Sequence, residues 1–472
     1  MLHRLYRFAA ALVLCALCHN AVAQRPTTAQ PVRQAVVRSD YMLAPFGRVA
    51  LFRPVREPRG ILLYLSDRTG WNAQDDRTAG DLAQSGLLVA GISTPTLMQA
   101  EDAWRGSRCV NPNYALIRLS RDVQHRMAVR MYRKPLIFGR GLGGTLAYAA
   151  LAQWKNAAYQ GVVSQQFSPL LPGRKPWCRT PGFLLHPTVA HPPRRLLTPN
   201  RQMEVPWVLL DPAGQGSHFA PFVGAVPHAR IVDTDAAHAP ALRDLLLSML
   251  PEMPDTQGVA VPDMPLTIVK PAAGVRQGDV MAIVYSGDGG WVGIGPDVAA
   301  ALAARGIPSV GVDSLSYFWS ARTPAGASRD LGQLIQSFAR HWGKSRVLLV
   351  GYSFGADALP LMVERLDPAI RAHVARLSML GFSNAADFQF HLASWMDITS
   401  DNAIPTVPAV QRLRGLDMQC VRGVDESDSA CPAIPRGTAA QFVVPGGHHF
   451  DRNSDLLTRI ILGQRRPGYV NG

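Results

Sequence analysis

The chain has 472 residues, of which 47% are hydrophobic and 17% charged, and its formal net charge is +14. This is the balance of a globular protein with two or three domains, and it excludes a disordered chain. Behind the N-terminal segment, no apolar run reaches the roughly 18 residues that span a bilayer. The basic residues are scattered without a basic arm, which argues against nucleic acid as a partner.

The first 23 residues have the pattern of a secretory signal peptide. A basic start, "MLHRLYR", precedes the apolar "FAAALVLCALC" and a small-x-small site that ends at Ala23. We expect cleavage after Ala23 and a mature protein outside the cytoplasm. Removal of Arg4 and Arg7 lowers the net charge from +14 to +12. Such a charge can hold a protein near anionic lipid head groups, or it can simply keep the protein soluble.

One pattern occurs twice in the mature chain. The segment "ILLYLSDRTGW" (61–71) matches "MAIVYSGDGGW" (281–291), and "KPLIFGRGLGGTLAYAAL" matches "SRVLLVGYSFGADALPLM". Residues 251–264 are rich in proline and have no apolar periodicity, which predicts a linker. We therefore predict a duplicated domain, first over residues 40–250 and again over residues 265–465.

In each half, short apolar segments alternate with amphipathic ones. In the second half we predict helices over 297–305, 328–342, 355–366 and 454–462, and strands over 282–286, 308–313, 346–351, 374–380, 417–422 and 440–445. Strands separated by helices predict an α/β fold with a parallel, doubly wound sheet. Continuous apolar strands such as "RVLLV" fit a sheet that is covered on both faces.

The stretch "GYSFG" (351–355) gives the second half a candidate nucleophile. A Gly-x-Ser-x-Gly frame between a buried strand and a helix is the nucleophile elbow of α/β-hydrolases, in which the glycines let strand and helix pass closely and Ser353 projects from a strained turn. The alternative is a plain turn. The N–H of Phe354, at a helix N-terminus, can bind an oxyanion. A Gly-rich loop after an early strand is either a simple turn or the second oxyanion donor, at Gly287, Asp288 and Gly289.

A serine hydroxyl needs a base and a carboxylate that aligns the base, and in this fold the acid precedes the histidine along the chain. Two histidines follow the last predicted strand, and we favour His448 over His449 because it comes directly after the glycines. The acidic loop before them offers three carboxylates, Asp425, Glu426 and Asp428. We favour Asp428 because it lies four residues before Pro432, the offset common for the acid in this fold.

Four cysteines remain after processing, an even number that suggests disulfides in an oxidising compartment. Of the three possible pairings we favour the local one, Cys109–Cys178 with Cys420–Cys431. The second bond would join the ends of the acidic loop and hold its carboxylate against the imidazole. No pair has the spacing of a zinc site, so we expect no metal.

Two further features of the second half have competing interpretations. Asp357 lies in the first helical turn after the serine, where the helix dipole favours a carboxylate. Alternatively, Asp357 contacts an ammonium group on the substrate. The adjacent aromatic residues of "SLSYFWSARTP" (314–324) either pack in the core or form a wall for an acyl or lipid substrate.

The first half has no side chain at the nucleophile position, because Gly141 stands where the serine would be. Its later loops contain Asp211 and His238 as remnants of an acid and a base. Without a hydroxyl these groups have nothing to activate. We therefore predict a degenerate, non-catalytic domain that helps to bind substrate or serves as structural support.

Four motifs of the second half, "YSGDGGW", "VGVDSLSYFW", "LVGYSFGADALP" and "VVPGGHHFD", closely resemble the VirJ/AcvB family of bacterial virulence proteins. The first half resembles the additional N-terminal domain of the longer, AcvB-like members, although relatives can hold a serine where Gly141 stands. The resemblance implies a periplasmic α/β-hydrolase. It makes Ser353 the nucleophile, the 425–428 loop the source of the acid and the His448–His449 pair the source of the base.

The same resemblance implies a substrate, since the family includes hydrolases of aminoacyl-phosphatidylglycerol, such as the lysyl or alanyl lipid. Ser353 would attack the aminoacyl carbonyl, phosphatidylglycerol would leave, and water would free the amino acid, without a metal or nucleotide cofactor. Two alternatives stay open. One is an esterase or peptidase with a soluble substrate, and the other is a non-enzymatic accessory of type IV secretion that uses its surface and not Ser353.

Overall fold

The computed structural model describes residues 35–464 except 154–157, 189–193, 212–215, 236–239, 252–255, 257 and 390–402. The predicted signal peptide lies outside the described residues. Within the described ranges, no helix combines the length and the apolar character needed to cross a bilayer.

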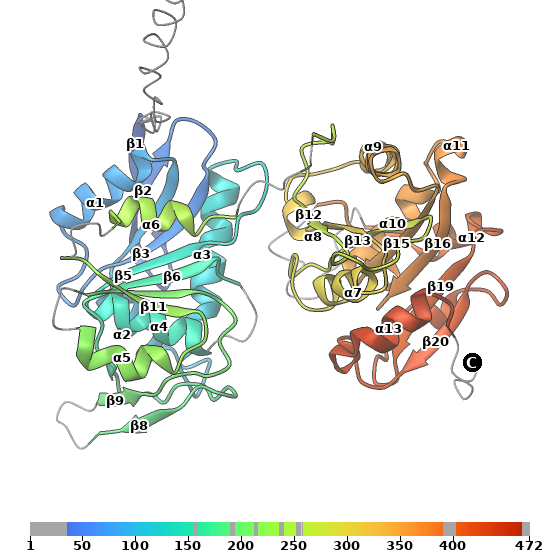
Figure 1. Ribbon diagram of the computed structural model, residues 1–472. Helices are drawn as coiled ribbons and strands as arrows, with labels where there is room; N and C mark the ends of the chain where they lie inside the picture. The colour runs from blue at the N-terminus through green and yellow to red at the C-terminus, as the bar shows by residue number, and fades with distance from the viewer. Residues whose placement is uncertain are drawn as a thin grey trace, which may run out of the picture.

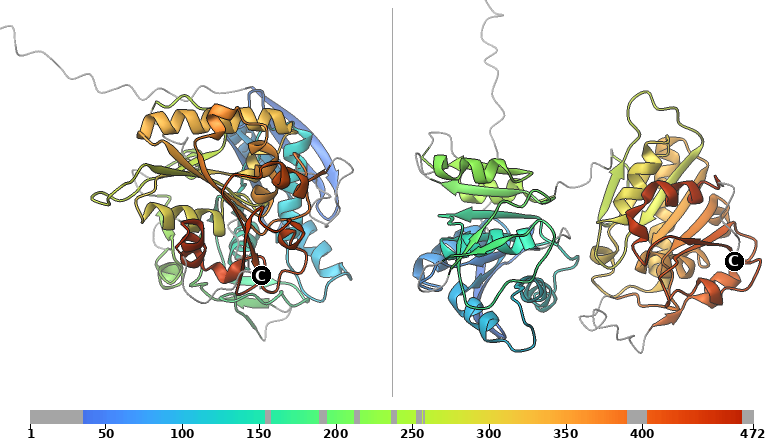
Figure 2. Two further views of the ribbon diagram at one scale, coloured as in Figure 1. Left: turned by 90° about the vertical axis from the view of Figure 1, so that its right-hand side faces the viewer. Right: turned by 90° about the horizontal axis from the view of Figure 1, so that it is seen from below.

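Two separate sheets organise the chain, one on each side of residues 251–264 (Figures 1 and 2). The first sheet has eight strands in the order β1 (Val36–Leu43), β2 (Gly47–Pro54), β4 (Leu87–Ile92), β3 (Gly60–Leu65), β5 (Leu136–Arg140), β6 (Gly161–Gln165), β10 (Trp207–Asp211) and β11 (Ala229–Asp233). The second sheet has seven, in the order β12 (Leu266–Val269), β14 (Ser309–Val312), β13 (Val280–Tyr285), β15 (Arg346–Tyr352), β16 (Val374–Leu380), β19 (Met418–Gly423) and β20 (Ala440–Val444).

Both sheets are parallel apart from antiparallel pairing at one edge, β1 with β2 and β2 with β4 in the first sheet, and β12 with β14 in the second. In both, the first two parallel strands are exchanged in space, β4 before β3 and β14 before β13. The prediction of two tandem, doubly wound α/β-hydrolase-like sheets is therefore confirmed.

Helices cover both faces of each sheet. On the first sheet, α1 (Ala73–Gln84) and α6 (Leu242–Ser248) pack on one face, and the other face is covered by α2 (Thr94–Ala103), α3 (Asn113–Arg126), α4 (Leu142–Gln153) and α5 (Gly216–Gly224). On the second, α7 (Ile294–Ala303) and α13 (Ser454–Ile461) pack on one face, and the other is covered by α8 (Ser314–Tyr317), α9 (Pro324–Trp342), α10 (Phe354–Val363) and α12 (Val407–Arg412). The short helix α11 (Pro368–Arg371) lies against α9.

Local sequence explains the elements that surround the candidate nucleophile. Six of the seven residues of β15, "RVLLVGY", are buried, as expected for a central parallel strand. The helix α9 begins where the Thr323 side chain accepts the N–H of Gly326, and it ends at Gly343 in the left-handed conformation, with φ of 61°. Its buried residues Leu331, Leu334, Ile335 and Phe338 recur at helical spacing.

The two halves share an internal contact that supports a duplication. The indole of Trp71 lies where a side chain at Gly91 would be, since an added Cβ there would be 2.2 Å from the ring. Trp291 and Gly311 have the same relation at 2.1 Å. Each tryptophan closes the turn after the first central strand and leaves room only for glycine on the neighbouring strand.

The described part of the chain also contains two smaller sheets and two disulfides. A three-stranded sheet, β7 (Leu170–Pro172), β9 (Arg194–Leu197) and β8 (Leu185–Pro187), belongs to the first half, and the pair β17 (Ala385–Ala386) and β18 (Ile404–Pro405) to the second. The disulfides join Cys109 to Cys178 and Cys420 to Cys431, the predicted pairing.

Candidate active site

Ser353 occupies a strained turn between β15 and α10. Its φ of 53° and ψ of −123° are rarely adopted by a residue with a side chain. The flanking glycines make the turn possible, because an added Cβ at Gly351 would lie 2.3 Å from the carbonyl oxygen of Gly355, and one at Gly355 would lie 2.6 Å from that of Tyr285. The backbone therefore has the geometry that the Gly-x-Ser-x-Gly frame predicts.

His448 contacts the hydroxyl of this serine. Its Nε2 lies 2.9 Å from Ser353 Oγ, and the histidine follows the last strand, β20, in a Gly-Gly loop. The ring packs against Gly381, where an added Cβ would be 2.8 Å from His448 Cε1. A larger residue after β16 would therefore push the imidazole away from the serine.

Glu426 holds the other side of the imidazole. Its Oε1 lies 2.6 Å from His448 Nδ1, and its Oε2 accepts the N–H of Gly423 at 3.0 Å. The Glu426 side chain is only 3% exposed. This hydrogen bond is the main cause that raises the pKa of His448, because it favours the protonated ring.

The structure corrects the preference for Asp428 as the acid. Asp425 and Asp428 are both exposed, and only Glu426 is buried in the turn that follows β19. The N–H of Glu426 donates to the Gly423 carbonyl oxygen and so closes a tight turn that directs its side chain back toward the histidine. The Cys420–Cys431 disulfide joins the two ends of this loop, as predicted.

His449 points to a different partner. Its Nδ1 lies 2.7 Å from the hydroxyl of Tyr352, the residue that precedes the serine. Of the two adjacent histidines, His448 is the one in contact with Ser353. The reasoning from sequence missed Tyr352 and Gly381, which both lie against this histidine pair, although both directly flank predicted strands.

The candidate oxyanion groups lie beside the serine. Phe354 is the first residue of α10 and directly follows the nucleophile, so its N–H lies at the N-terminus of the helix. Gly287 faces the serine directly, since an added Cβ there would be 3.2 Å from Ser353 Cβ. Asp288 and Gly289 follow it at an exposed turn that the N–H of Gly290 closes onto the Gly287 carbonyl oxygen.

Asp357 is buried one helical turn after the serine. It is 6% exposed, and its Oδ1 accepts the N–H of Ser383 at 2.7 Å, so it ties α10 to the loop after β16. Burial raises the pKa of Asp357 to about 8. In the first domain Thr145 makes the equivalent tie to Ser168, with its Oγ1 2.8 Å from the Ser168 carbonyl oxygen. This geometry favours a role within the fold over direct contact with a substrate.

The aromatic residues of the 314–324 segment are packed inside. Tyr317 and Phe318 are 0% exposed and Trp319 is 3% exposed. Phe318 meets the ring of Phe354 edge-on, with 5.0 Å between ring centres. The segment therefore supports the residue after the nucleophile and does not present an open apolar wall.

The first domain keeps the elbow but fills its site with a carboxylate. Gly141 has φ of 54°, close to the 53° of Ser353. Asp67 Oδ1 accepts the N–H of Leu142 at 2.9 Å. Leu142 is the first-domain equivalent of Phe354, the residue after the nucleophile. A side chain at 141 would collide with it, since an added Cβ would lie 2.1 Å from Asp67 Oδ1. Asp67 aligns with Gly287, and Gly141 aligns with Ser353. The first domain therefore has a carboxylate where the second has a glycine, and a glycine where the second has the serine.

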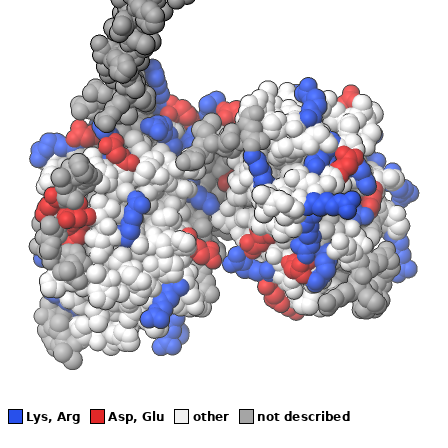
Figure 3. Space-filling view, viewed as in Figure 1, with Lys and Arg blue, Asp and Glu red and all other residues white. Residues whose placement is uncertain are grey.

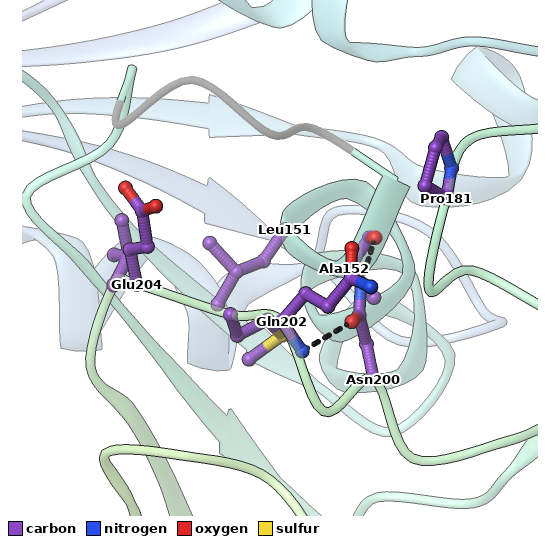
Figure 4. A pocket seen from close by; sticks show the side chains of 8 residues that line it. Leu151, Ala152, Pro181, Asn200, Gln202 and Glu204 are labelled. Atoms are coloured by element: carbon purple, nitrogen blue, oxygen red, sulfur yellow. Dashed lines mark hydrogen bonds between the residues drawn. The ribbon is translucent and has the colours of Figure 1, made fainter. Parts of the chain in front are cut away.

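The other remnants of the first domain do not rebuild a triad in the described residues. Asp211 is buried at the end of β10, where burial raises its pKa. His238 lies outside the described residues. Two small pockets of about 10 Å³ each, room for roughly one water molecule, occur in this domain, away from Ser353. Figure 4 shows one of them, where Asn200 donates to the Ala152 carbonyl oxygen and accepts the N–H of Gln202.

Residues 279–467 match the family described as Bacterial virulence protein (VirJ). No curated protein matches the chain. Similar solved structures include an α/β serine hydrolase without lid from Xanthomonas campestris, 15% identical, with 42% of this chain and 86% of that chain covered and a TM-score of 0.29. Est1E from Butyrivibrio proteoclasticus is 12% identical, with coverages of 44% and 97% and a TM-score of 0.32. The poly(3-hydroxybutyrate) depolymerase LpqC from Bordetella parapertussis is 15% identical, with coverages of 43% and 84% and a TM-score of 0.31.

Proposed function

We propose that the protein is a serine ester hydrolase whose nucleophile is Ser353, and the match of residues 279–467 to the VirJ family supports this proposal. The observation that carries the proposal is the continuous hydrogen-bonded chain from Ser353 Oγ through His448 to Glu426, with distances of 2.9 and 2.6 Å. A serine, an imidazole and a buried carboxylate in this order are what acyl transfer requires.

Each group then has a defined task. Ser353 Oγ attacks the ester carbonyl while His448 Nε2 takes its proton. Glu426 accepts the Nδ1–H bond, which fixes the tautomer and stabilises the imidazolium that forms. The N–H of Phe354, together with the Gly287 loop, faces the developing oxyanion. His448 returns the proton to the leaving alcohol, and a water molecule then repeats the sequence to release the acyl group.

For the substrate we propose the aminoacyl ester of aminoacyl-phosphatidylglycerol, cleaved in the periplasm after removal of the signal peptide. The resemblance to the VirJ/AcvB family supports this choice, and so does the positive charge of the mature chain. Figure 3 shows Lys and Arg side chains spread over both domains on the face in view, with acidic ones between them. Such a surface suits an anionic membrane more than a discrete acidic partner.

The test compares two substrates with the purified mature protein. Vesicles that contain lysyl- or alanyl-phosphatidylglycerol should release free amino acid, and a Ser353→Ala variant should lose this activity by several orders of magnitude. Hydrolysis of a short soluble ester without release from the lipids would favour an esterase for a soluble substrate. Normal function of Ser353→Ala in cells would favour the secretion accessory.

A further inference from the structure

We propose that the first domain is a fixed cover on the active-site edge of the second domain, and that His125 and Tyr132 are positioning residues for the catalytic loops. The inference rests on the proposed hydrolase function and assigns a task to the domain that has no nucleophile. It follows from which edges of the two sheets meet, from the contacts between them and from the path of those contacts to Ser353.

The edges that meet are opposite ones. In the second domain the contacting groups lie at the carboxyl edge of the sheet, where parallel α/β sheets place their sites. They are Asp263, Trp319, Ser320 and Arg452. In the first domain they lie at the amino edge, in the last turn of α3, in the α3–β5 connection and before β10. They are His125, Arg130, Tyr132 and Glu204. Figure 1 shows α3 and α8 on the sides of the two domains that face each other.

The contact between the domains is a packed one. The His125 ring stacks on Trp319, with 3.8 Å between ring centres and 19° between planes, and Tyr132 lies 4.9 Å from the same indole. Beside them, Ser320 Oγ donates to the Arg130 carbonyl oxygen at 2.7 Å. The Arg130 guanidinium lies 3.5 Å from the Asp263 carboxylate.

Burial shows that this surface is part of the core. Tyr132 belongs to the first domain by sequence but packs in the main hydrophobic cluster of the second, where it is 5% exposed. Trp319 is 3% exposed. Large aromatic side chains that are this buried between two domains hold them in one arrangement, unlike the polar and solvated contacts of domains that move freely.

A short path leads from this contact to the reacting groups. Trp319 follows Phe318, whose ring packs on Phe354, the residue after the nucleophile. The helix that precedes Trp319 is capped by Asp313, which accepts the N–H of Ser316 at 3.0 Å. The same carboxylate lies against Gly290 of the oxyanion loop, where an added Cβ would be 3.1 Å from its Oδ1. Displacement of Trp319 therefore acts on both candidate oxyanion groups.

Opposite charges face each other across the boundary between the domains. Arg121 of α3 is 6% exposed, and burial lowers its pKa while Asp288 of the oxyanion loop opposes that shift. Burial likewise lowers the pKa of Lys134 of the first domain, and the Asp313 carboxylate of the second domain opposes that shift. On the other side of the edge, Arg452, close behind the catalytic histidine in the chain, lies 3.9 Å from Glu204 of the first domain.

The test uses the full mature chain. We expect a His125→Ala/Tyr132→Ala variant to react with a fluorophosphonate at Ser353 about tenfold more slowly, since small misplacement of catalytic groups has a large effect on rate. On a short ester kcat should fall by the same factor with little change in KM. The His125→Phe/Tyr132→Phe variant keeps both rings and should stay within about twofold of the wild type. Arg118→Ala, on the exposed face of the same helix, is the matched control.

A second readout does not depend on activity. Backbone amides of residues 314–322 should exchange with deuterium at least about tenfold faster in the double alanine variant, because the cover no longer holds them. If the double variant is unstable, His125→Ala alone removes only a half-buried ring and gives the same comparison. Unchanged labelling and unchanged exchange would overturn the cover. Absence of labelling in the wild type would instead contradict the hydrolase function, while faster exchange would still support the cover.

Discussion

Replacement of Glu426 by glutamine tests which carboxylate serves the histidine. The carboxylate makes two contacts at once, 2.6 Å to His448 Nδ1 and 3.0 Å to the Gly423 N–H, and it accepts in both. An amide has only one acceptor atom. If its oxygen stays on Gly423, its NH₂ faces Nδ1, and His448 adopts the tautomer that cannot take the serine proton.

The magnitude follows from the two orientations of the amide. The wrong tautomer lowers kcat by about 10⁴ in a known triad. The reversed amide keeps the tautomer but sets two buried donors against each other, which costs about 1–3 kcal/mol. It also lacks the charge that stabilises the imidazolium. We therefore expect Glu426→Gln to lower kcat/KM between about 10²- and 10⁴-fold.

The assay is steady-state hydrolysis of a short ester by the mature protein across a pH range. The histidine must be neutral to act as base, and its pKa is raised above the ordinary value of about 6.5. The rate of the wild type should therefore fall as pH drops through a value above 6.5, and in Glu426→Gln this limb should move to lower pH. Asp428→Asn is the matched control, and it should change the rate by less than about threefold because that side chain is exposed. A large loss in Asp428→Asn, or none in Glu426→Gln, would refute the reasoning.

Three further predictions use other parts of the site. Gly287→Asp should abolish ester hydrolysis, because the new carboxylate would occupy the elbow as Asp67 does in the first domain. Circular dichroism should show that the variant still folds, and retained activity would contradict the comparison between the two elbows. Because protonation of the buried Asp357 favours the folded state, the free energy of unfolding of the wild type should fall by up to roughly 1.4 kcal/mol per pH unit as pH rises from about 4 to about 8. Denaturant titrations of Asp357→Asn should lack this decrease, and equal pH dependence in the two proteins would count against the raised pKa. Reduction of Cys420–Cys431 should lower activity before the domain unfolds, and full activity after reduction would show that the acid loop needs no disulfide.

Much of the fold could be predicted because most residues of its central elements are apolar. The strand β16 has the predicted bounds, and α10, α13 and β15 differ by a few residues. The edge strands β1 and β12 were not predicted. Five of the eight residues of β1 are exposed, and the polar run Arg38, Ser39 and Asp40 interrupts its apolar ends, so the segment lacks the continuous apolar signal that marks a buried strand.

The candidate site was predictable only in part. The motif itself contains the serine, and the glycines before His448 point to the correct ring of the pair. The acid was wrong because the expectation counted residues back from Pro432, whereas the tight turn after Gly423 decides which carboxylate is buried. The contact of Asp67 with Leu142 joins residues 75 apart, and only the folded chain shows that this carboxylate fills the space a serine would need.

The most direct test of the central claim is to label the mature protein with a fluorophosphonate and locate the adduct by mass spectrometry. We predict a single adduct on the peptide that contains Ser353, none in Ser353→Ala, and a strongly reduced rate in His448→Ala. An unlabelled wild type, or an adduct on any other residue, would contradict the account.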